Sequence, residues 1–219
     1  MNQPLSIVHS SGRFVVIDKP AGLLSVPGLG EANQDCVPRR LAAMFPAASG
    51  PLTVHRLDME TSGLLVLGLD ADAHRTLSRQ FEARTVTKRY VAVLAGDIGP
   101  LGTAGEVSLP MRPDIDNRPR QIVDHVHGRP ALTRWRLLGV EPGPQGATWS
   151  RIEFEPHTGR SHQLRLHAAH ESGLNLPIVG DKLYGDPSLS PRLLLHATVL
   201  EFDDPETGAR VRVESPAPF

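Results

Sequence analysis

At 219 residues the chain is long enough for one large domain or two small ones, and with 40% hydrophobic and 21% charged residues it has an ordinary globular composition. Its single cysteine, Cys36, excludes an intrachain disulfide. No secretory signal pattern opens the sequence, and the longest strongly apolar run, at 64–69, is too short to span a bilayer. We therefore expect a soluble, cytoplasmic protein.

The charge is unevenly distributed, although the formal net charge is only −1. Residues 75–90 contain five cations and one acid, and residues 157–170 contain two arginines, four histidines and no acid. A near-neutral total argues against non-specific coating of nucleic acid, yet it is compatible with a basic face that binds phosphate groups. The alternative, that these cations only form a solvated helix surface, stays open on charge alone.

The first half of the chain alternates between strand and helix patterns. A strand is predicted at 13–18, before the breakers Pro20 and Gly22. Helical spacing of apolar residues predicts a helix at 35–45 with Asp35 as its cap. A buried strand at 64–69, a helix at about 71–84 and a strand at 88–96 follow.

The second half is dominated by strands. Residues 96–131 are rich in Gly and Pro and predict loops with short strands, with Arg112, Arg118 and Arg120 on a mobile arm. Two strands joined by the turn PGPQG follow, then a loop that enters a helix ending near Gly173, and a closing strand in LLLHATVLEF. Strands outnumber helices without regular alternation. We predict one α+β domain over 1–219 with a largely antiparallel mixed sheet, flanked by helices and loops.

Three stretches combine groups that could carry chemistry: HRLD with TSG at 55–63, KRY at 88–90 and HTGRSHQLRLH at 157–167. The histidines of the third stretch allow a zinc site, but no HExxH or CxxC occurs and two arginines lie among them. HRLD is similar to part of the catalytic loop of protein kinases, but the sequence contains no Gly-rich phosphate-binding loop of that family. A serine hydrolase is not supported either, because no GxSxG motif occurs. A glycosidase would need a second acid tied to Asp58.

What remains is a single carboxylate, Asp58, placed before an apolar strand. Alone, it could be an ordinary turn cap. An ionised carboxylate in an apolar pocket needs a cation or several donors to offset its lost hydration, and Arg165 is a candidate for that cation. Tyr90 could offer an aromatic face to a flat ligand, although a core position is the plainer interpretation.

Together these stretches resemble the RluA family of pseudouridine synthases. The matching segments are KPAGLLSVPG, HRLDMETSG, KRYVAVL, GRSHQLRLH, GDKLYG and LLLHA, in this order along the chain. The resemblance implies a pseudouridine synthase catalytic domain without an additional S4 RNA-binding domain. The SVPG segment, the RPRQIV stretch and the length favour the members that act on uridines of tRNA anticodon stem-loops and 23S ribosomal RNA.

The family resemblance also implies roles for particular residues. Asp58 would be the nucleophile or base acting on a flipped-out uridine, Arg165 its ion-pair partner, Tyr90 a stacking partner of the uracil, and Arg56 the side chain that fills the space left by the flipped base. Further contacts to RNA would come from the following residues: Lys88, Arg89, Arg160, His162, Gln163 and Leu164.

No cofactor and no metal is expected, because the isomerisation involves neither redox change nor hydrolysis. The expected partner is structured RNA rather than DNA or a membrane, and nothing in the sequence demands more than a monomer. A non-catalytic RNA-binding module or RNA chaperone on the same fold is the alternative function.

Overall fold

The computed structural model describes residues 4–219 and has the predicted α+β class, with mostly antiparallel strand pairing and a parallel pairing of β3 with β10. The chain divides into two compact units. The first joins the chain up to Lys88 with residues 196–218, and the second contains residues 89–195 with Phe219. Each unit is built on its own set of strands.

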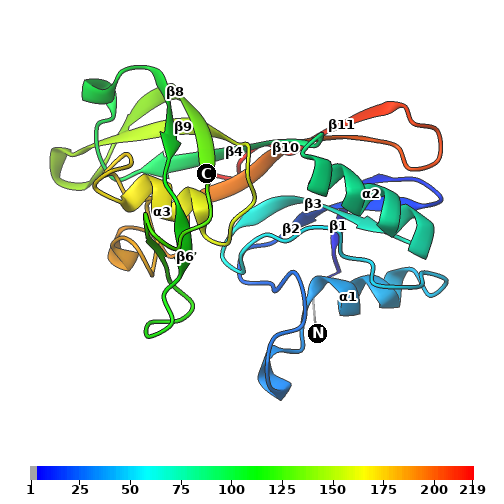
Figure 1. Cartoon of the computed structure of the whole chain (residues 1–219). Helices are drawn as coiled ribbons and strands as arrows, with labels where there is room; N and C mark the ends of the chain where they lie inside the picture. The colour runs from blue at the N-terminus through cyan, green and yellow to red at the C-terminus, as the bar shows by residue number, and fades with distance from the viewer. Residues whose placement is uncertain (1–3) are drawn as a thin grey trace. The chain divides into compact units, whose positions relative to one another are not determined.

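The first unit contains strands β1, β2, β3 and β10, paired in that order, with β11 added to β10. Helix α2 lies above β2 and β3 in the view of Figure 1, and α1 lies below them. The bounds are β1 Ser6–Ser10, β2 Phe14–Lys19, α1 Val37–Met44, β3 Ser62–Gly68, α2 Ala71–Ala83, β10 Leu195–Asp203 and β11 Arg210–Glu214, with a short 3-10 helix at Glu31–Asn33.

Strand β3 is buried along its whole length, as its run of apolar residues predicts. Alternate residues of β2 and β3 point to one face, where Phe14, Val16, Leu64 and Val66 pack against Leu77 of α2. The residues between them, 15, 17, 65 and 67, are also fully buried. Burial on both faces makes β3 a rigid base for the residues that precede it.

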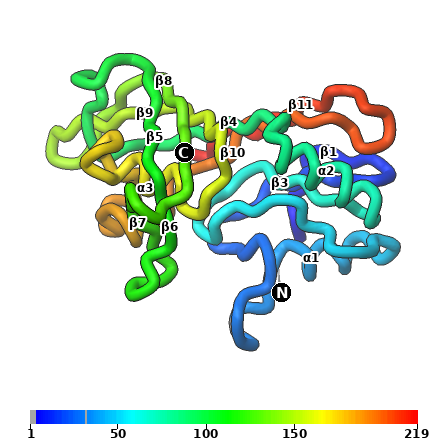
Figure 2. The backbone as a smooth tube through the Cα atoms, viewed as in Figure 1, coloured from blue at the N-terminus to red at the C-terminus, as the bar shows by residue number. Residues whose placement is uncertain are grey.

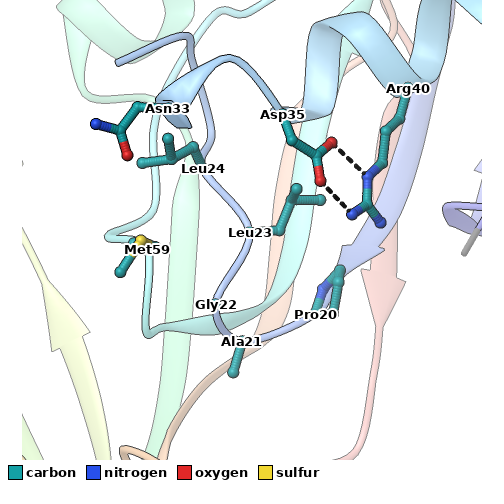
Figure 3. A pocket seen from close by; sticks show the side chains of 9 residues that line it. All are labelled: Pro20, Ala21, Gly22, Leu23, Leu24, Asn33, Asp35, Arg40 and Met59. Atoms are coloured by element: carbon teal, nitrogen blue, oxygen red, sulfur yellow. Dashed lines mark hydrogen bonds and ion pairs between the residues drawn. The ribbon is translucent and has the colours of Figure 1, made fainter. Parts of the chain in front are cut away.

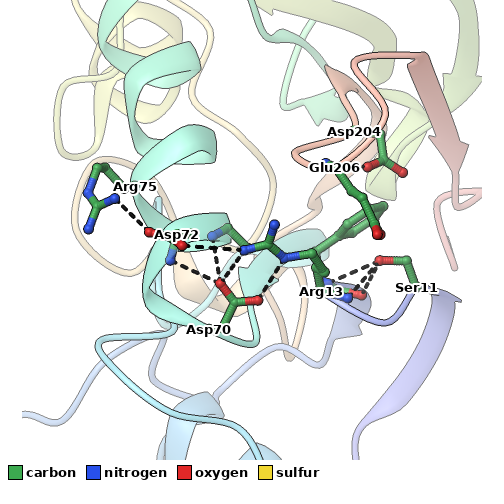
Figure 4. A network of polar contacts seen from close by, with 9 residues as sticks. Ser11, Arg13, Asp70, Asp72, Arg75, Asp204 and Glu206 are labelled. Carbon is green, nitrogen blue, oxygen red and sulfur yellow. Dashed lines mark hydrogen bonds and ion pairs between the residues drawn. The ribbon is translucent and has the colours of Figure 1, made fainter.

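Helix α2 begins at a well-satisfied cap (Figure 4). Asp70 accepts hydrogen bonds from the amides of Asp72 and Ala73, both at 2.9 Å, and a bidentate ion pair from Arg13 at 2.9 and 2.7 Å. The Arg13 guanidinium and these amides hold the pKa of Asp70 well below its usual value. Arg75 pairs with Asp72 one turn into the helix, so this cation of the basic 75–90 stretch is locally neutralised.

Helix α1 corrects one expectation. Asp35 does not cap it: the N-cap is Cys36, which makes no side-chain capping bond, and the Asp35 carboxylate instead pairs with Arg40 at 2.8 and 2.6 Å. The competing partner explains the difference, because a bidentate guanidinium binds a carboxylate more strongly than a backbone amide does.

The second unit contains the antiparallel strands β4, β9, β8 and β5, in that order, and a separate β6–β7 hairpin whose tip spans residues 114–120 (Figure 2). The bounds are β4 Thr87–Leu94, β5 Ala104–Ser108, β6 Met111–Pro113, β7 Gln121–Val123, β8 Leu132–Pro142, β9 Thr148–Pro156 and α3 Gln163–Ala169, with 3-10 helices at Gly99–Leu101, Pro144–Gly146 and Pro187–Leu189.

Helix α3 ends earlier than predicted. Its last residue is Ala169, and Gly173 lies beyond it in a turn. A Cβ at Gly173 would lie 2.2 Å from the carbonyl oxygen of His167. Glycine is needed here because the chain folds back against the helix end, not because the helix stops at this residue.

Candidate active site

Asp58 lies in the first unit, in the loop that leads into β3. Its carbonyl accepts a hydrogen bond from the amide of Thr61 at 3.1 Å, so residues 58–61 form a turn directly before the strand. The preceding Leu57 is buried, and its two backbone groups both bind the hydroxyl of Ser25, at 3.1 and 2.7 Å. The half-buried Asp58 therefore follows a fixed segment of backbone.

The residue after Asp58 is fixed by a buried ammonium group. Lys19, the last residue of β2, is fully buried, and its Nζ donates hydrogen bonds to the carbonyls of Pro20 at 3.0 Å, Leu23 at 2.8 Å and Met59 at 3.0 Å. Such donors must be satisfied when an ammonium group is buried, so the three carbonyls are held firmly. The turn at Asp58 is thus braced on both sides.

His55 supports the same loop from beneath and is not available as a base. Its ring stacks on Phe81 of α2 at a centroid distance of 4.3 Å, and its Nε2 accepts a hydrogen bond from the amide of Val66 at 3.2 Å. Burial, together with the charge of Lys88, lowers the pKa of His55 to about 3. At neutral pH the ring is uncharged and serves as an acceptor that ties the loop to β3.

A chain of four polar side chains crosses the strands next to the turn. The hydroxyl of Ser215 donates to Asp18 at 2.7 Å, Nε2 of His196 lies 3.2 Å from the Ser215 hydroxyl, and Nδ1 of His196 lies 2.8 Å from the hydroxyl of Ser62. The Ser215 hydroxyl uses its one proton on Asp18, so toward His196 it can only accept. His196 carries its proton on Nε2 and accepts at Nδ1 from Ser62, the first residue of β3.

The next residue of β3, Gly63, allows β10 to approach closely. Its φ is +111°, and an added Cβ would lie 2.3 Å from the carbonyl oxygen and 2.5 Å from the nitrogen of Ala197. Only glycine adopts this conformation without strain and without that clash. The glycine of the TSG sequence is therefore required by the β3–β10 pairing.

In the second unit, Arg165 on α3 forms a buried bidentate ion pair with Asp181, at 2.8 and 2.6 Å. The two residues are 3% and 0% exposed. Burial alone would raise the pKa of Asp181, but the Arg165 guanidinium and the amides of Leu183 and Tyr184 hold the pKa below its usual value. Sequence reasoning gave Asp181 no role, although GDKLYG stood out as a matching segment.

Tyr184 connects this ion pair to the β6–β7 hairpin. Its ring lies under the Arg165 guanidinium at 5.4 Å and the Arg120 guanidinium at 5.3 Å. Its hydroxyl accepts from the amide of Gln121 at 2.6 Å and lies 3.0 Å from Nδ1 of His162. The guanidinium of Arg120, on the predicted arm, therefore lies against Tyr184 at the base of the β6–β7 hairpin.

The other expected side chains of this unit sit on β4 and at the start of α3. Tyr90, 9% exposed, lies opposite Phe154 of β9. Gln163 is buried, and its amide binds four groups of its own unit, including the hydroxyls of Thr158 at 2.7 Å and Thr133 at 2.9 Å. Leu164 is 7% exposed. Gln163 thus shapes the loop that carries its neighbours.

The cations predicted to contact RNA, Arg56 in the space left by the flipped base and the others at phosphates, differ in how strongly other groups engage them. Arg56 is exposed. Arg89 lies 3.3 Å from Glu155, and Arg160 donates to the carbonyl of Pro130 at 3.2 Å. Burial and the nearby Arg84 lower the pKa of Lys88. On the arm, Arg112 pairs with Asp124, whereas Arg118 is exposed.

The part of the chain that the structure describes can also be searched for a metal site and for a membrane-spanning helix. Within 4–219, no three His, Cys, Asp or Glu side chains lie close enough together to hold a metal ion. In that part of the chain, no helix has the length and apolar character needed to cross a membrane.

Comparisons with a family model, with curated proteins and with solved structures all match the same kind of protein. The family model described as RNA pseudouridylate synthase matches residues 13–170. The chain is 42% identical to the dual-specificity RNA pseudouridine synthase RluA of Pasteurella multocida and 41% identical to that of Escherichia coli K12; each match covers 98% of this chain and 94% of the relative.

Among solved structures, human RNA pseudouridylate synthase domain containing 1 matches with a TM-score of 0.80 at 30% identity, covering 100% of this chain and 87% of that one. Human RNA pseudouridylate synthase domain containing 4 matches with a TM-score of 0.76 at 25% identity, covering 97% and 88%.

Proposed function

The chain belongs to the RNA pseudouridylate synthase family, and we propose that it isomerises specific uridines to pseudouridine in tRNA anticodon stem-loops, in 23S ribosomal RNA, or in both. Its relatives are named RNA pseudouridine synthases, which are isomerases, and this chain is an enzyme of that class. The dual-specificity name of relatives 41–42% identical supports the proposal of two RNA classes.

The reaction breaks the bond between uracil N1 and ribose C1′, turns the base and joins C5 to C1′, and the C5 proton moves to solvent while N1 gains one. We assign the nucleophile or base to Asp58. Its support is structural: Ser25 fixes the backbone before it and Lys19 the backbone after it. A carboxylate on such a braced turn loses little entropy when it meets its target.

We assign to Arg165 the role of keeping Asp58 ionised, because the carboxylate must stay charged near an apolar base. The Asp181 carboxylate holds the guanidinium of Arg165 in one orientation. Tyr90 is assigned to stacking on the uracil, and the exposed Arg56 to the space that the flipped base leaves.

The remaining expected contacts would hold the folded RNA around the target. Lys88, Arg89 and Arg160 would bind phosphates, and the start of α3, with His162, Gln163 and Leu164, would contact the nucleotide. Shape and unpaired loops rather than a linear code would set specificity, since single-stranded loops are where proteins read RNA bases.

One observation carries the proposal: the match to an RNA pseudouridine synthase covers 98% of the chain. The HRLD acid within it lies on a turn braced from both sides. The test is to map pseudouridine in total RNA from cells with and without this protein. We expect individual sites in tRNA, 23S rRNA or both to disappear without it. Unchanged maps, together with RNA binding by the purified protein, would favour the non-catalytic RNA-binding module instead.

A further inference from the structure

A pocket of about 480 Å³ lies in the first unit beside the Asp58 turn (Figure 3). One wall is the turn that follows β2, and the other walls come from Met59 and from the segment leading into α1. The lining residues are Pro20, Ala21, Gly22, Leu23, Leu24, Asn33, Asp35, Arg40 and Met59. None of the roles assigned above uses this pocket, except that Met59 follows Asp58 in the chain.

The pocket is preformed rather than a gap in a loose surface. Lys19 binds the carbonyls of Pro20, Leu23 and Met59, and the amide of Gly22 donates to the Met59 carbonyl at 2.8 Å. The Leu24 carbonyl accepts from the amide of Val37, the first residue of α1, at 2.9 Å. Because the walls are joined by these bonds, a ligand would enter without having to order them.

The lining favours a flat, uncharged ligand with polar edges. The lining is more polar than apolar, and its apolar part comes mainly from Pro20, Leu24 and Met59, of which Met59 is 43% exposed. On one side, Arg40 is joined to Asp35 by a bidentate ion pair; on the opposite side, next to Leu24, lies Asn33, whose amide donates to the carbonyl of Leu29 at 2.8 Å (Figure 3). The cation is already matched by a carboxylate, so this site offers a phosphate little net attraction. A nucleobase, with two apolar faces and a hydrogen-bonding rim, fits these walls.

We propose that this pocket, the flanking-base pocket, receives the unpaired base next to the target uridine. The inference rests on the proposed function, which places the target at Asp58. Asp58 and Met59 are consecutive, so their Cα atoms are about 3.8 Å apart. Met59, which lines the pocket, is therefore the residue next to Asp58. Enzymes that act on flipped bases commonly set their substrate choice through the nucleotides on either side.

The test combines a substitution that fills the pocket with RNAs that lack one base. Ala21→Trp places a large side chain at one wall of the pocket, and Ala43→Trp makes the same change at an exposed position of α1 outside the lining. Each protein is assayed on a stem-loop RNA, on an RNA abasic immediately 5′ of the target, and on one abasic immediately 3′ of it.

For the wild type, one abasic RNA should lose kcat/KM by roughly tenfold, the size expected for one base-stacking contact. Ala21→Trp should lose a similar factor on the intact RNA and nothing further on that abasic RNA, whereas Ala43→Trp should behave as the wild type. Independent, multiplicative losses at both flanking positions would overturn the proposal. So would full activity of Ala21→Trp on the intact RNA.

A binding measurement separates this inference from the proposed function and covers a poorly folding Ala21→Trp. Asp58→Asn protein is titrated with RNA that carries 2-aminopurine at the coupled flanking position, with and without Leu24→Ala, which removes part of a wall. We expect a fluorescence change on binding that Leu24→Ala diminishes. If that change is present but no enzyme form yields pseudouridine, the proposed function fails and the pocket stands. If product forms without any change, the pocket proposal fails.

Discussion

Protonation of His55 should destabilise the first unit as the pH falls. Burial and the Lys88 charge lower the folded-state pKa of His55 to about 3, against 6.5 for an exposed histidine. Between pH 6.5 and pH 3, His55 binds a proton in the unfolded chain but not in the folded protein, so the free energy of unfolding falls as the pH falls. The contribution is complete above about pH 6.5 and is lost progressively toward pH 3.

The magnitude follows from the size of the shift. Each pH unit well below 6.5 costs about 1.4 kcal/mol for one such group, and the cost between pH 7 and pH 5 is about 2 kcal/mol because the first half-unit contributes little. His167 of α3, whose pKa burial lowers to about 4, acts in the same direction. Because His167 is present in both proteins, its contribution to the pH dependence cancels when the wild type is compared with His55→Gln.

In His55→Gln the side-chain oxygen can still accept from the Val66 amide, but no group there titrates. The assay is denaturant unfolding followed by circular dichroism at pH 7 and pH 5. The variant should lose about 2 kcal/mol less than the wild type over this interval. Equal losses in the two proteins would refute the neutral state assigned to His55.

Three further substitutions test the supports of the site. Gly63→Ala brings a Cβ to 2.3 Å from the Ala197 carbonyl oxygen at a φ of +111°, and we expect a loss of more than about 3 kcal/mol in unfolding free energy or failure to accumulate folded protein. Asp181→Asn breaks the buried ion pair with Arg165 and should cost about 3–5 kcal/mol, measured by thermal unfolding. His196→Leu removes one hydrogen bond from each of two buried hydroxyls and should cost about 2–4 kcal/mol by denaturant unfolding.

Controls of the same chemical type separate these effects from mutation in general. Gly139→Ala adds a Cβ with no neighbour within 4 Å, and Glu155→Gln removes the part-exposed ion pair to Arg89. Both should change stability by less than about 1 kcal/mol. A test variant that is no less stable than its control would show that the corresponding contact contributes little in solution.

The sequence predicted those elements whose burial follows from their own residues. Strand β3 is apolar on both faces, and α2 has an apolar stripe with a capping Asp70. Strands β1 and β11 were not predicted: β1 is exposed at all five positions, and β11 is a strand because it pairs with β10. The partner of an edge strand cannot be recognised from the strand itself.

The same division holds in the candidate site. The motifs identified Asp58, Tyr90 and Arg165, but not what braces them. Lys19 reaches the Met59 carbonyl across 40 residues, and His196 reaches Ser62 across 134. Periodicity and spacing carry no information about contacts this distant in sequence, whereas a fold that pairs β3 with both β2 and β10 makes them inevitable.

The central claim is that one carboxylate on a braced turn drives the isomerisation of uridine in RNA. Its most direct test uses purified protein and tRNA whose uridines carry tritium at C5, because forming pseudouridine releases that hydrogen to water. We predict release by the wild type and none above background by Asp58→Asn, while circular dichroism and RNA affinity of the variant stay at wild-type level. Tritium release by a folded, RNA-binding Asp58→Asn protein at the wild-type rate would contradict the account.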